Sequence, residues 1–193
     1  FESINSTGDP LTSLETFKPR VLRDLSGRDF DDIAKQPFDN INRFIYSTKK
    51  RADQEKLVER VVQDFYYATT GKRVPNPKMM RYQRIALRDS YGRLNSLPKS
   101  KGKDVSKKYF QIFSNIVLLR QDLKTWEKDD RNDTDNPNTT LEKVGIPNLD
   151  SDAALALRII SKEFEIAIPL VALLITEHIE RDMSKGSLEN GIK

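Results

Sequence analysis

The sequence contains no cysteine and only one histidine, His178, and these shortages exclude several kinds of site. Without cysteine the chain forms no disulfide, no thiolate metal site and no cysteine nucleophile. One histidine does not supply zinc sites that need two or three, or di-iron sites that need paired Glu-x-x-His motifs. The absence of cysteine also favours a reducing intracellular compartment. We expect no metal site, and we interpret His178 as an ordinary histidine on the polar face of a helix.

Motifs of the common enzyme classes are missing as well. The sequence has no Gly-x-Ser-x-Gly elbow and no Gly-x-Gly-x-x-Gly, and Gly71-Lys72 lacks the Walker spacing. Residues 129–135 are rich in Asp and Asn, but no register supplies the acids, the glycine and the final glutamate of an EF-hand loop. We therefore expect a non-enzymatic protein without catalytic residues or cofactors. A helical enzyme that uses two of its carboxylates is the remaining enzymatic alternative.

Long hydrophobic runs are also absent. Residues 166–175 form an apolar run of ten residues, whereas a membrane-spanning helix needs roughly 20. We expect no transmembrane segment and interpret this run as a helix buried by its neighbours. With 193 residues, 37% of them hydrophobic, the chain is long enough for one folded domain that spans residues 1–193. It begins with Phe1 rather than Met, which indicates a processed or excised piece.

The sequence does contain apolar residues at helical spacing. No segment of several residues alternates between apolar and polar side chains, the pattern that is typical of strands. The clearest helix is predicted for residues 52–70, with Gly71 at its end. The next is expected to begin with Asn76 as its cap and Pro77 in its first turn. A long helix, apolar on most of its circumference, is predicted for residues 104–129.

The two ends of the chain are less regular. Before residue 50 we predict short helical pieces, the first capped by Ser13, with new starts at Pro19 and Pro37. A second long core helix is predicted for residues 151–184, kinked at Pro169.

Three segments are expected to lie outside the helical core. These are the flexible ends, 1–12 and 186–193, and a long polar loop, 129–150. Residues 99–103 read as a basic linker. The sequence thus predicts an all-α fold: a single compact domain of about six or seven helices, packed as an irregular bundle around two long core helices.

Charge is distributed unevenly along the chain. Residues 71–108 contain twelve Lys and Arg but only two acids, Asp89 and Asp104, a net charge of +10. The rest of the chain has 21 basic and 27 acidic residues, a net charge of −6. Clusters of one sign repel unless something opposes them. This asymmetry indicates a partner that carries negative charge.

Helical geometry narrows the basic segment to one face. At about 100° per residue, four cations fall on one arc: Lys78, Arg81, Arg84 and Arg88. A neighbouring arc is apolar and is predicted to face the core: Met79, Met80, Ala86, Leu87, Tyr91 and Leu94. Arginine offers planar, bidentate donors to phosphate oxygens, and Tyr82 lies beside the cations, where an aromatic ring can stack on a base.

The function expected from these patterns is non-enzymatic association with nucleic acid, as a scaffold, packaging or regulatory protein that contacts the phosphate backbone. The alternative is a helical protein-protein interaction or adaptor module whose basic face meets an acidic partner or whose apolar patches mediate homo-oligomerisation. An anionic lipid surface is a further candidate for the basic face. The candidate binding residues are Lys72, Arg73, Lys78, Arg81, Tyr82, Arg84, Arg88, Arg93, Lys99, Lys101, Lys103, Lys107 and Lys108.

Overall fold

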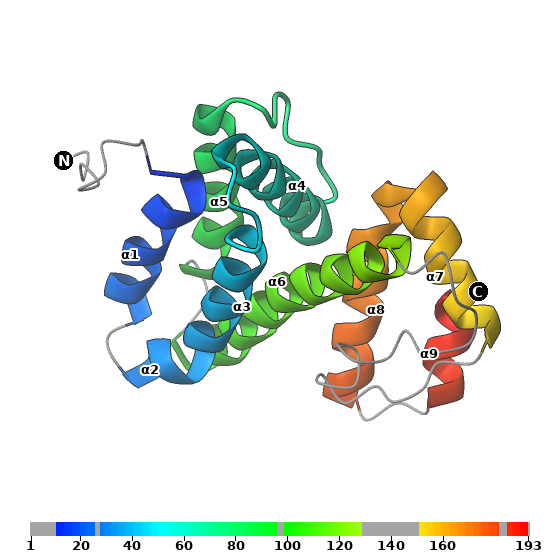
Figure 1. The fold of residues 1–193 in the computed structure, drawn as a ribbon. Coiled ribbons are helices and arrows are strands. Elements are labelled where there is room, and N and C mark those ends of the chain that lie inside the picture. The colour runs from blue at the N-terminus through cyan, green and yellow to red at the C-terminus, as the bar shows by residue number, and fades with distance from the viewer. Residues whose placement is uncertain (1–10, 26–27, 96–98, 129–150, 182–184, 193) are drawn as a thin grey trace. The chain divides into compact units, whose positions relative to one another are not determined.

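The computed structural model describes residues 11–25, 28–95, 99–128, 151–181 and 185–192 (Figure 1). They form helices joined by turns, and no strand occurs among them, which confirms the predicted all-α fold. They include eight α-helices of eight residues or more, close to the expected number. The predictions for residues 1–10 and 129–150 lie outside the described residues. Contacts divide the chain into two compact units, residues 1–110 (unit 1) and 111–193 (unit 2), which we describe in turn.

Unit 1 begins with α1, Ser13–Leu25, which runs without interruption through Pro19. The predicted restart at Pro19 is therefore wrong. A proline inside a helix removes one hydrogen bond and costs about 3 kcal/mol. Leu14, Phe17 and Val21 lie on one face of α1 on both sides of the proline, and all three are buried. Burying side chains of this size contributes roughly 1.5–3 kcal/mol each, which offsets the cost.

The next helical segment is continuous from residue 28 to residue 45, although its hydrogen-bond pattern changes along it. It comprises α2, Arg28–Phe30, the π-helical turn η1, Asp31–Lys35, and α3, Gln36–Ile45. Pro37 lies in the first turn of α3, as predicted, but the backbone before it is already helical, so the expected restart is wrong. In an α-helical pattern the ring of Pro37 would clash with the carbonyl of Ile33. The wider π turn immediately before the proline relieves this clash.

The helix predicted most clearly by the sequence is confirmed as α4, Arg51–Thr70. It ends at Gly71, whose φ of 69° lies in the left-handed region that favours glycine. The N–H of Gly71 donates to the carbonyl of Tyr67 over 2.8 Å, which closes the last turn. The buried hydrophobic side chains of α4 are Val58, Val61, Val62 and Phe65.

The core of unit 1 is largely aromatic. α5, Met80–Asn95, packs against α1 and α4, and α6, Lys99–Lys128, belongs to this unit up to residue 110. Four rings from four helices contact one another with centroids 5.5–6.2 Å apart: Phe17, Phe38, Tyr91 and Phe110. Such pairs contribute about 0.5–1.5 kcal/mol beyond the area they bury. The ring of Tyr91 thereby joins α5 to α1 and α6.

Residues 99–103, predicted as a basic linker, are the first residues of α6. Lys and Ser are compatible with a helix, and the one glycine among them, Gly102, costs only about 1 kcal/mol. The prediction overestimated the effect of a single glycine. The central position predicted for residues 104–129 is supported, since every residue from Ile112 to Arg120 is buried.

Unit 2 is built from the remainder of α6 and three further helices. These are α7, Ser151–Glu163, α8, Ile168–Arg181, and α9, Lys185–Ile192, with a short 3-10 turn, η3, at Glu165–Ala167. Their core consists of Leu119 from α6, Ala153 and Leu157 from α7, Ile168, Val171 and Ile175 from α8, and Leu188 and Ile192 from α9. One hydrophobic cluster thus joins all four helices of this unit.

Two predictions for this part of the chain are wrong. A kink was expected at Pro169, but the helix instead ends before Phe164 and a new helix, α8, begins at Ile168. Pro169 lies in the first turn of α8, where its missing N–H has no helical partner to lose. The second long core helix is therefore the pair α7 and α8. The segment 186–193, expected to be a flexible end, is helical up to Ile192, since Leu188 and Ile192 are buried in the core of unit 2.

The apolar run at residues 166–175 is buried only in part. Ile168, Val171 and Ile175 face the core of unit 2, whereas Ile166, Leu170 and Leu174 are exposed. The prediction that neighbours would bury the whole run is therefore wrong. Among the helices in the described residues, none combines the length and apolar character needed to span a membrane.

Candidate functional site

The positive charge of the chain belongs to unit 1. Unit 1 has 23 basic and 14 acidic residues, a net charge of +9, whereas unit 2 has 10 basic and 15 acidic residues, a net charge of −5. The division of charge in the sequence therefore coincides closely with the structural division. α5 lies in unit 1 and carries the central part of the basic segment.

Gln83 fixes the first turn of α5. Its side chain is buried, and its Oε1 accepts a hydrogen bond of 2.7 Å from the hydroxyl of Ser13 at the start of α1. Its Nε2 donates to the carbonyl of Pro77, also over 2.7 Å. One amide thus ties α5 both to α1 and to the turn that precedes α5. The role of Gln83 was not predicted, because Ser13 lies 70 residues earlier in the chain and Pro77 lies outside α5.

The second half of α5 is held by α4 as well as by the aromatic core. Thr69 Oγ1 of α4 and Ser90 Oγ of α5 lie 3.1 Å apart and share a hydrogen bond. Burial raises the pKa of Tyr91 to about 12, with a further contribution from the negative charge of Asp24. Burial also raises the pKa of Tyr109 well above its usual value. The inner face of α5 is thus held by contacts with α4 and with the aromatic core.

The helix begins later than predicted. The N–H of Met79 donates to the carbonyl of Asn76 over 3.1 Å, which closes a turn with Pro77 at its second position, and the helix starts at Met80. Proline favours that position of a turn because its φ is already suitable. Lys78 is exposed in this turn and does not continue the helical row of arginines. The predicted row of four cations on one helix is therefore wrong in this detail.

Arg81, Arg84 and Arg88 form the row that remains. All three side chains are exposed, and on a helix they fall within about 60° of one another over roughly 10 Å. Arg88 pairs with the neighbouring Asp89 at 3.3 Å. Within the described part of the chain, no acidic side chain pairs with Arg81 or Arg84. Two exposed cations one turn apart are thus available to a partner.

The other candidate cations lie elsewhere on α5, on α6, or in the segment that joins α4 to α5. Lys72 and Arg73, in the segment that joins α4 to α5, are exposed, as is Lys107 on α6. Lys108 is half-buried and already has an interaction within the protein. Four further candidates lie on α5 or α6 with side chains outside the described residues: Arg93, Lys99, Lys101 and Lys103. We define the basic surface as Lys72, Arg73, Lys78, Arg81, Arg84 and Arg88.

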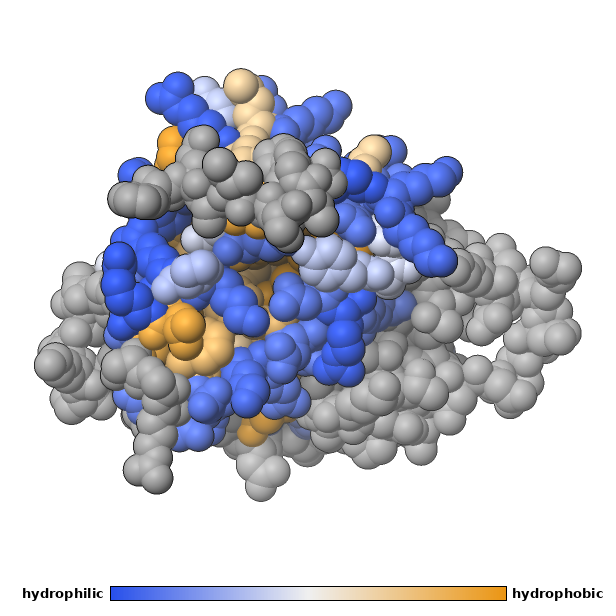
Figure 2. Space-filling model, turned by 60° about the vertical axis from the view of Figure 1, so that its left-hand side comes forward, coloured by the Kyte–Doolittle hydropathy of each residue, from blue (hydrophilic) through white to orange (hydrophobic). Residues whose placement is uncertain are grey.

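The apolar arc predicted for α5 is confirmed in its middle but not at its start. Ala86, Leu87 and Tyr91 are buried. Met79 is 50% exposed because it precedes the helix, and Tyr82 is half-buried. Two large uncharged side chains, those of Met79 and Tyr82, therefore lie at least partly at the surface, close to Arg81 in the chain. Figure 2 shows one face of the chain, where hydrophilic side chains surround smaller areas of hydrophobic atoms.

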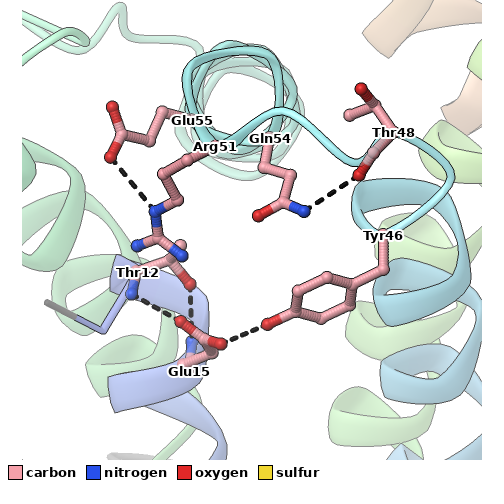
Figure 3. A network of polar contacts seen from close by, with 7 residues as sticks. All are labelled: Thr12, Glu15, Tyr46, Thr48, Arg51, Gln54 and Glu55. Atoms are coloured by element: carbon pink, nitrogen blue, oxygen red, sulfur yellow. Dashed lines mark hydrogen bonds and ion pairs between the residues drawn. The ribbon is translucent and has the colours of Figure 1, made fainter. Parts of the chain in front are cut away.

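A second polar cluster connects α1, α3 and α4 (Figure 3). The N–H of Thr12 donates to Glu15 Oε2 over 2.6 Å, and the N–H of Glu15 donates to Thr12 Oγ1 over 3.2 Å, which is a capping box. The predicted cap at Ser13 is therefore displaced by one residue. Glu15 also accepts a hydrogen bond from the hydroxyl of Tyr46, and Arg51 pairs with Glu55 at 3.2 Å.

The pKa shifts in this cluster show that its hydrogen bonds stabilise charged Glu15 and neutral Tyr46. Burial acts to raise the pKa of Glu15, but hydrogen bonds from Tyr46 and Thr12 and the charge of Arg51 outweigh it, so the pKa is lowered. Burial and the negative charge of Glu15 raise the pKa of Tyr46 to about 12. The capping box was present in the sequence as Thr12-x-x-Glu15, whereas the contact with Tyr46 had no sequence signal.

No metal-binding cluster of His, Asp or Glu occurs among the described residues. His178 is half-buried on α8, and its Nδ1 is buried without a hydrogen-bond partner in the described structure. Compared with protein-family models, curated proteins and solved structures, the chain matches none of them.

Proposed function

We propose that the basic surface of unit 1 binds the phosphate backbone of nucleic acid and that the protein acts without catalysis, as a scaffold, packaging or regulatory component. The observation that carries the proposal is the pair Arg81 and Arg84, exposed, one turn apart and without an acidic partner in the described structure, on a helix whose inner face is fixed. Guanidinium groups so placed suit the oxygens of successive phosphates.

The net charge of unit 1 supports the same function. A charge of +9 in one unit raises the local concentration of a polyanion and steers its approach. The neutralisation of phosphates by arginine and lysine releases counterions, so the affinity depends on salt. Binding of this kind positions the protein on nucleic acid without selecting a base sequence.

The test is a triple substitution, Arg81→Ala, Arg84→Ala and Arg88→Ala, assayed by fluorescence anisotropy with a labelled oligonucleotide at low salt. We expect a loss of affinity of tenfold or more with unchanged helical circular dichroism. The matched control removes three other exposed cations of unit 1, Lys35, Lys49 and Lys56, and therefore the same net charge. Equal affinities for the two triple variants would show that only net charge matters and would refute the proposed surface.

A second candidate function, self-association, is favoured by exposed apolar side chains in unit 2. Seven large ones are 38–59% exposed: Leu155, Ile159, Phe164, Ile166, Leu170, Leu174 and Ile179. Leu155 and Ile159 are one turn apart on α7, and so are Leu170 and Leu174 on α8. Exposed apolar side chains that form contiguous patches are typical of interaction sites, and each of these pairs is contiguous on its helix. Sedimentation equilibrium should give a mass that rises with concentration, and Leu170→Ser with Leu174→Ser should abolish the rise; a constant monomer mass for the wild type excludes this candidate.

A further inference from the structure

The end of α5 that carries Arg81 combines cations with two exposed, weakly polar side chains. Met79 is 50% exposed and Tyr82 is half-buried. The N–H of Tyr82 donates to the carbonyl of Met79 over 2.9 Å, so the two residues lie within the same turn of the backbone at the start of α5. Lys78 directly precedes Met79 in the chain, and Arg81 directly precedes Tyr82. A thioether and a phenol thus lie beside two cations.

These side chains suit a flat, apolar surface more than they suit a phosphate. In a duplex the faces of the bases are covered by stacking, and only their edges are accessible in the grooves. In a single strand the faces are free and stack on aromatic side chains. Sulfur also makes favourable contacts with aromatic rings. The neighbourhood of Tyr82 is therefore more complementary to an unpaired base than to a base pair.

α5 offers no free amide for reading adenine in a duplex among its described side chains, although its exposed arginines could contact guanine as well as phosphates. Asparagine and glutamine are the side chains that read adenine, and Gln83 is buried with both ends of its amide engaged. The arginine row extends for roughly 10 Å, which is enough for a few phosphates of one strand. These features fit contact with the backbone of one strand, and the preference for an unpaired strand rests on Tyr82 and Met79.

We infer that the ligand class of the basic surface is single-stranded nucleic acid, with phosphates on Arg81 and Arg84 and an unpaired base against Tyr82 and Met79. This inference rests on the proposed function and adds to it the strandedness of the ligand and the residues that select it. Tyr82 and Met79 are expected to contribute affinity that does not depend on salt, because stacking releases no counterions.

The test compares one labelled single strand with the duplex made from it, by anisotropy at matched salt. The wild type should bind the single strand more tightly. Tyr82→Ala should lose about fivefold to thirtyfold in affinity for the single strand and little for the duplex, whereas Tyr82→Phe should retain both affinities. Met79→Ala should act in the same direction. Leu22→Ala, which truncates an exposed apolar side chain of α1, is the control and should change neither affinity.

The outcomes separate this inference from the proposed function. If the wild type binds duplex as tightly as single strand, or if Tyr82→Ala leaves their ratio unchanged, the inference is wrong while the basic surface stands. If the wild type binds neither nucleic acid, both proposals are wrong. A loss confined to the single strand, with an unchanged dependence of affinity on salt, supports the inference.

Discussion

A buried hydrogen bond in unit 2 gives a sharp test of how this structure is stabilised. Asn115 of α6 and Thr176 of α8 are 2% and 0% exposed. Asn115 Nδ2 donates to Thr176 Oγ1 over 2.9 Å, and Thr176 Oγ1 donates to the carbonyl of Ala172 over 2.8 Å. Asn115 Oδ1 accepts from Gln111 Nε2 over 3.1 Å. The substitution Thr176→Val replaces the hydroxyl by a methyl of similar size and leaves the Asn115 amide without its acceptor.

The expected loss follows from what remains buried. The carbonyl of Ala172 keeps its helical hydrogen bond, so the main cost is the unsatisfied N–H of Asn115, about 1–3 kcal/mol. The added methyl recovers part of this through burial, roughly 1 kcal/mol. We therefore expect Thr176→Val to lower the free energy of unfolding by about 1 kcal/mol, within a range of about 0–2 kcal/mol. Adding Asn115→Leu removes the stranded donor, and the double variant should regain most of that loss.

Urea unfolding followed by circular dichroism is the suitable assay, because the elements of unit 2 in the described residues are helical. A loss of about 1 kcal/mol lowers the midpoint by about 0.5 M. A double-mutant cycle then isolates the coupling between positions 115 and 176. If the losses of the two single variants simply add, the reasoning about this hydrogen bond is refuted.

Three further predictions concern unit 1. Gly71→Ala should cost about 1 kcal/mol in urea unfolding, because φ is 69° while no atom lies within 4 Å of the added Cβ; an unchanged stability would contradict the left-handed cap. Glu15→Gln should destabilise the protein at pH 7. Because folding lowers the pKa of Glu15, the difference in stability from wild type should shrink as the pH falls below 4.5, which unfolding measured over a range of pH would show. A difference that persists at low pH would exclude the carboxylate as its cause. Tyr91→Phe should remove one tyrosine from the ionisation near pH 12 in an ultraviolet titration, and stability that Tyr91 contributes below pH 10 in the wild type should be lost as the pH rises towards 12.

The fold class was predictable from the sequence because periodic apolar side chains determine helices. α4 and its end at Gly71 combine a regular apolar face with a residue that accepts a positive φ, so both local signals agreed. The proline positions were harder to interpret. Pro19 and Pro37 suggested breaks, but buried side chains on both sides of Pro19 and a π turn before Pro37 keep the helices continuous. Tertiary packing outweighed the local signal.

The charge of the candidate site was predictable from the sequence, but the contacts that position its side chains were not. The excess of basic residues and the spacing of Arg81, Arg84 and Arg88 are visible in the sequence. The turn that displaces Lys78 and exposes Met79 depends on the amide of Gln83, which reaches Ser13, 70 residues earlier. A contact between residues so far apart leaves no trace in the spacing of either segment.

The central claim is that the basic surface binds the nucleic-acid backbone, and the salt dependence of wild-type affinity tests it most directly. Anisotropy titrations of a labelled single strand over a series of salt concentrations give the slope of log affinity against log salt. With three to six cations each neutralising a phosphate, the slope should be about −2 to −4. Absence of binding at the lowest salt, or an affinity that does not change with salt, would contradict the claim.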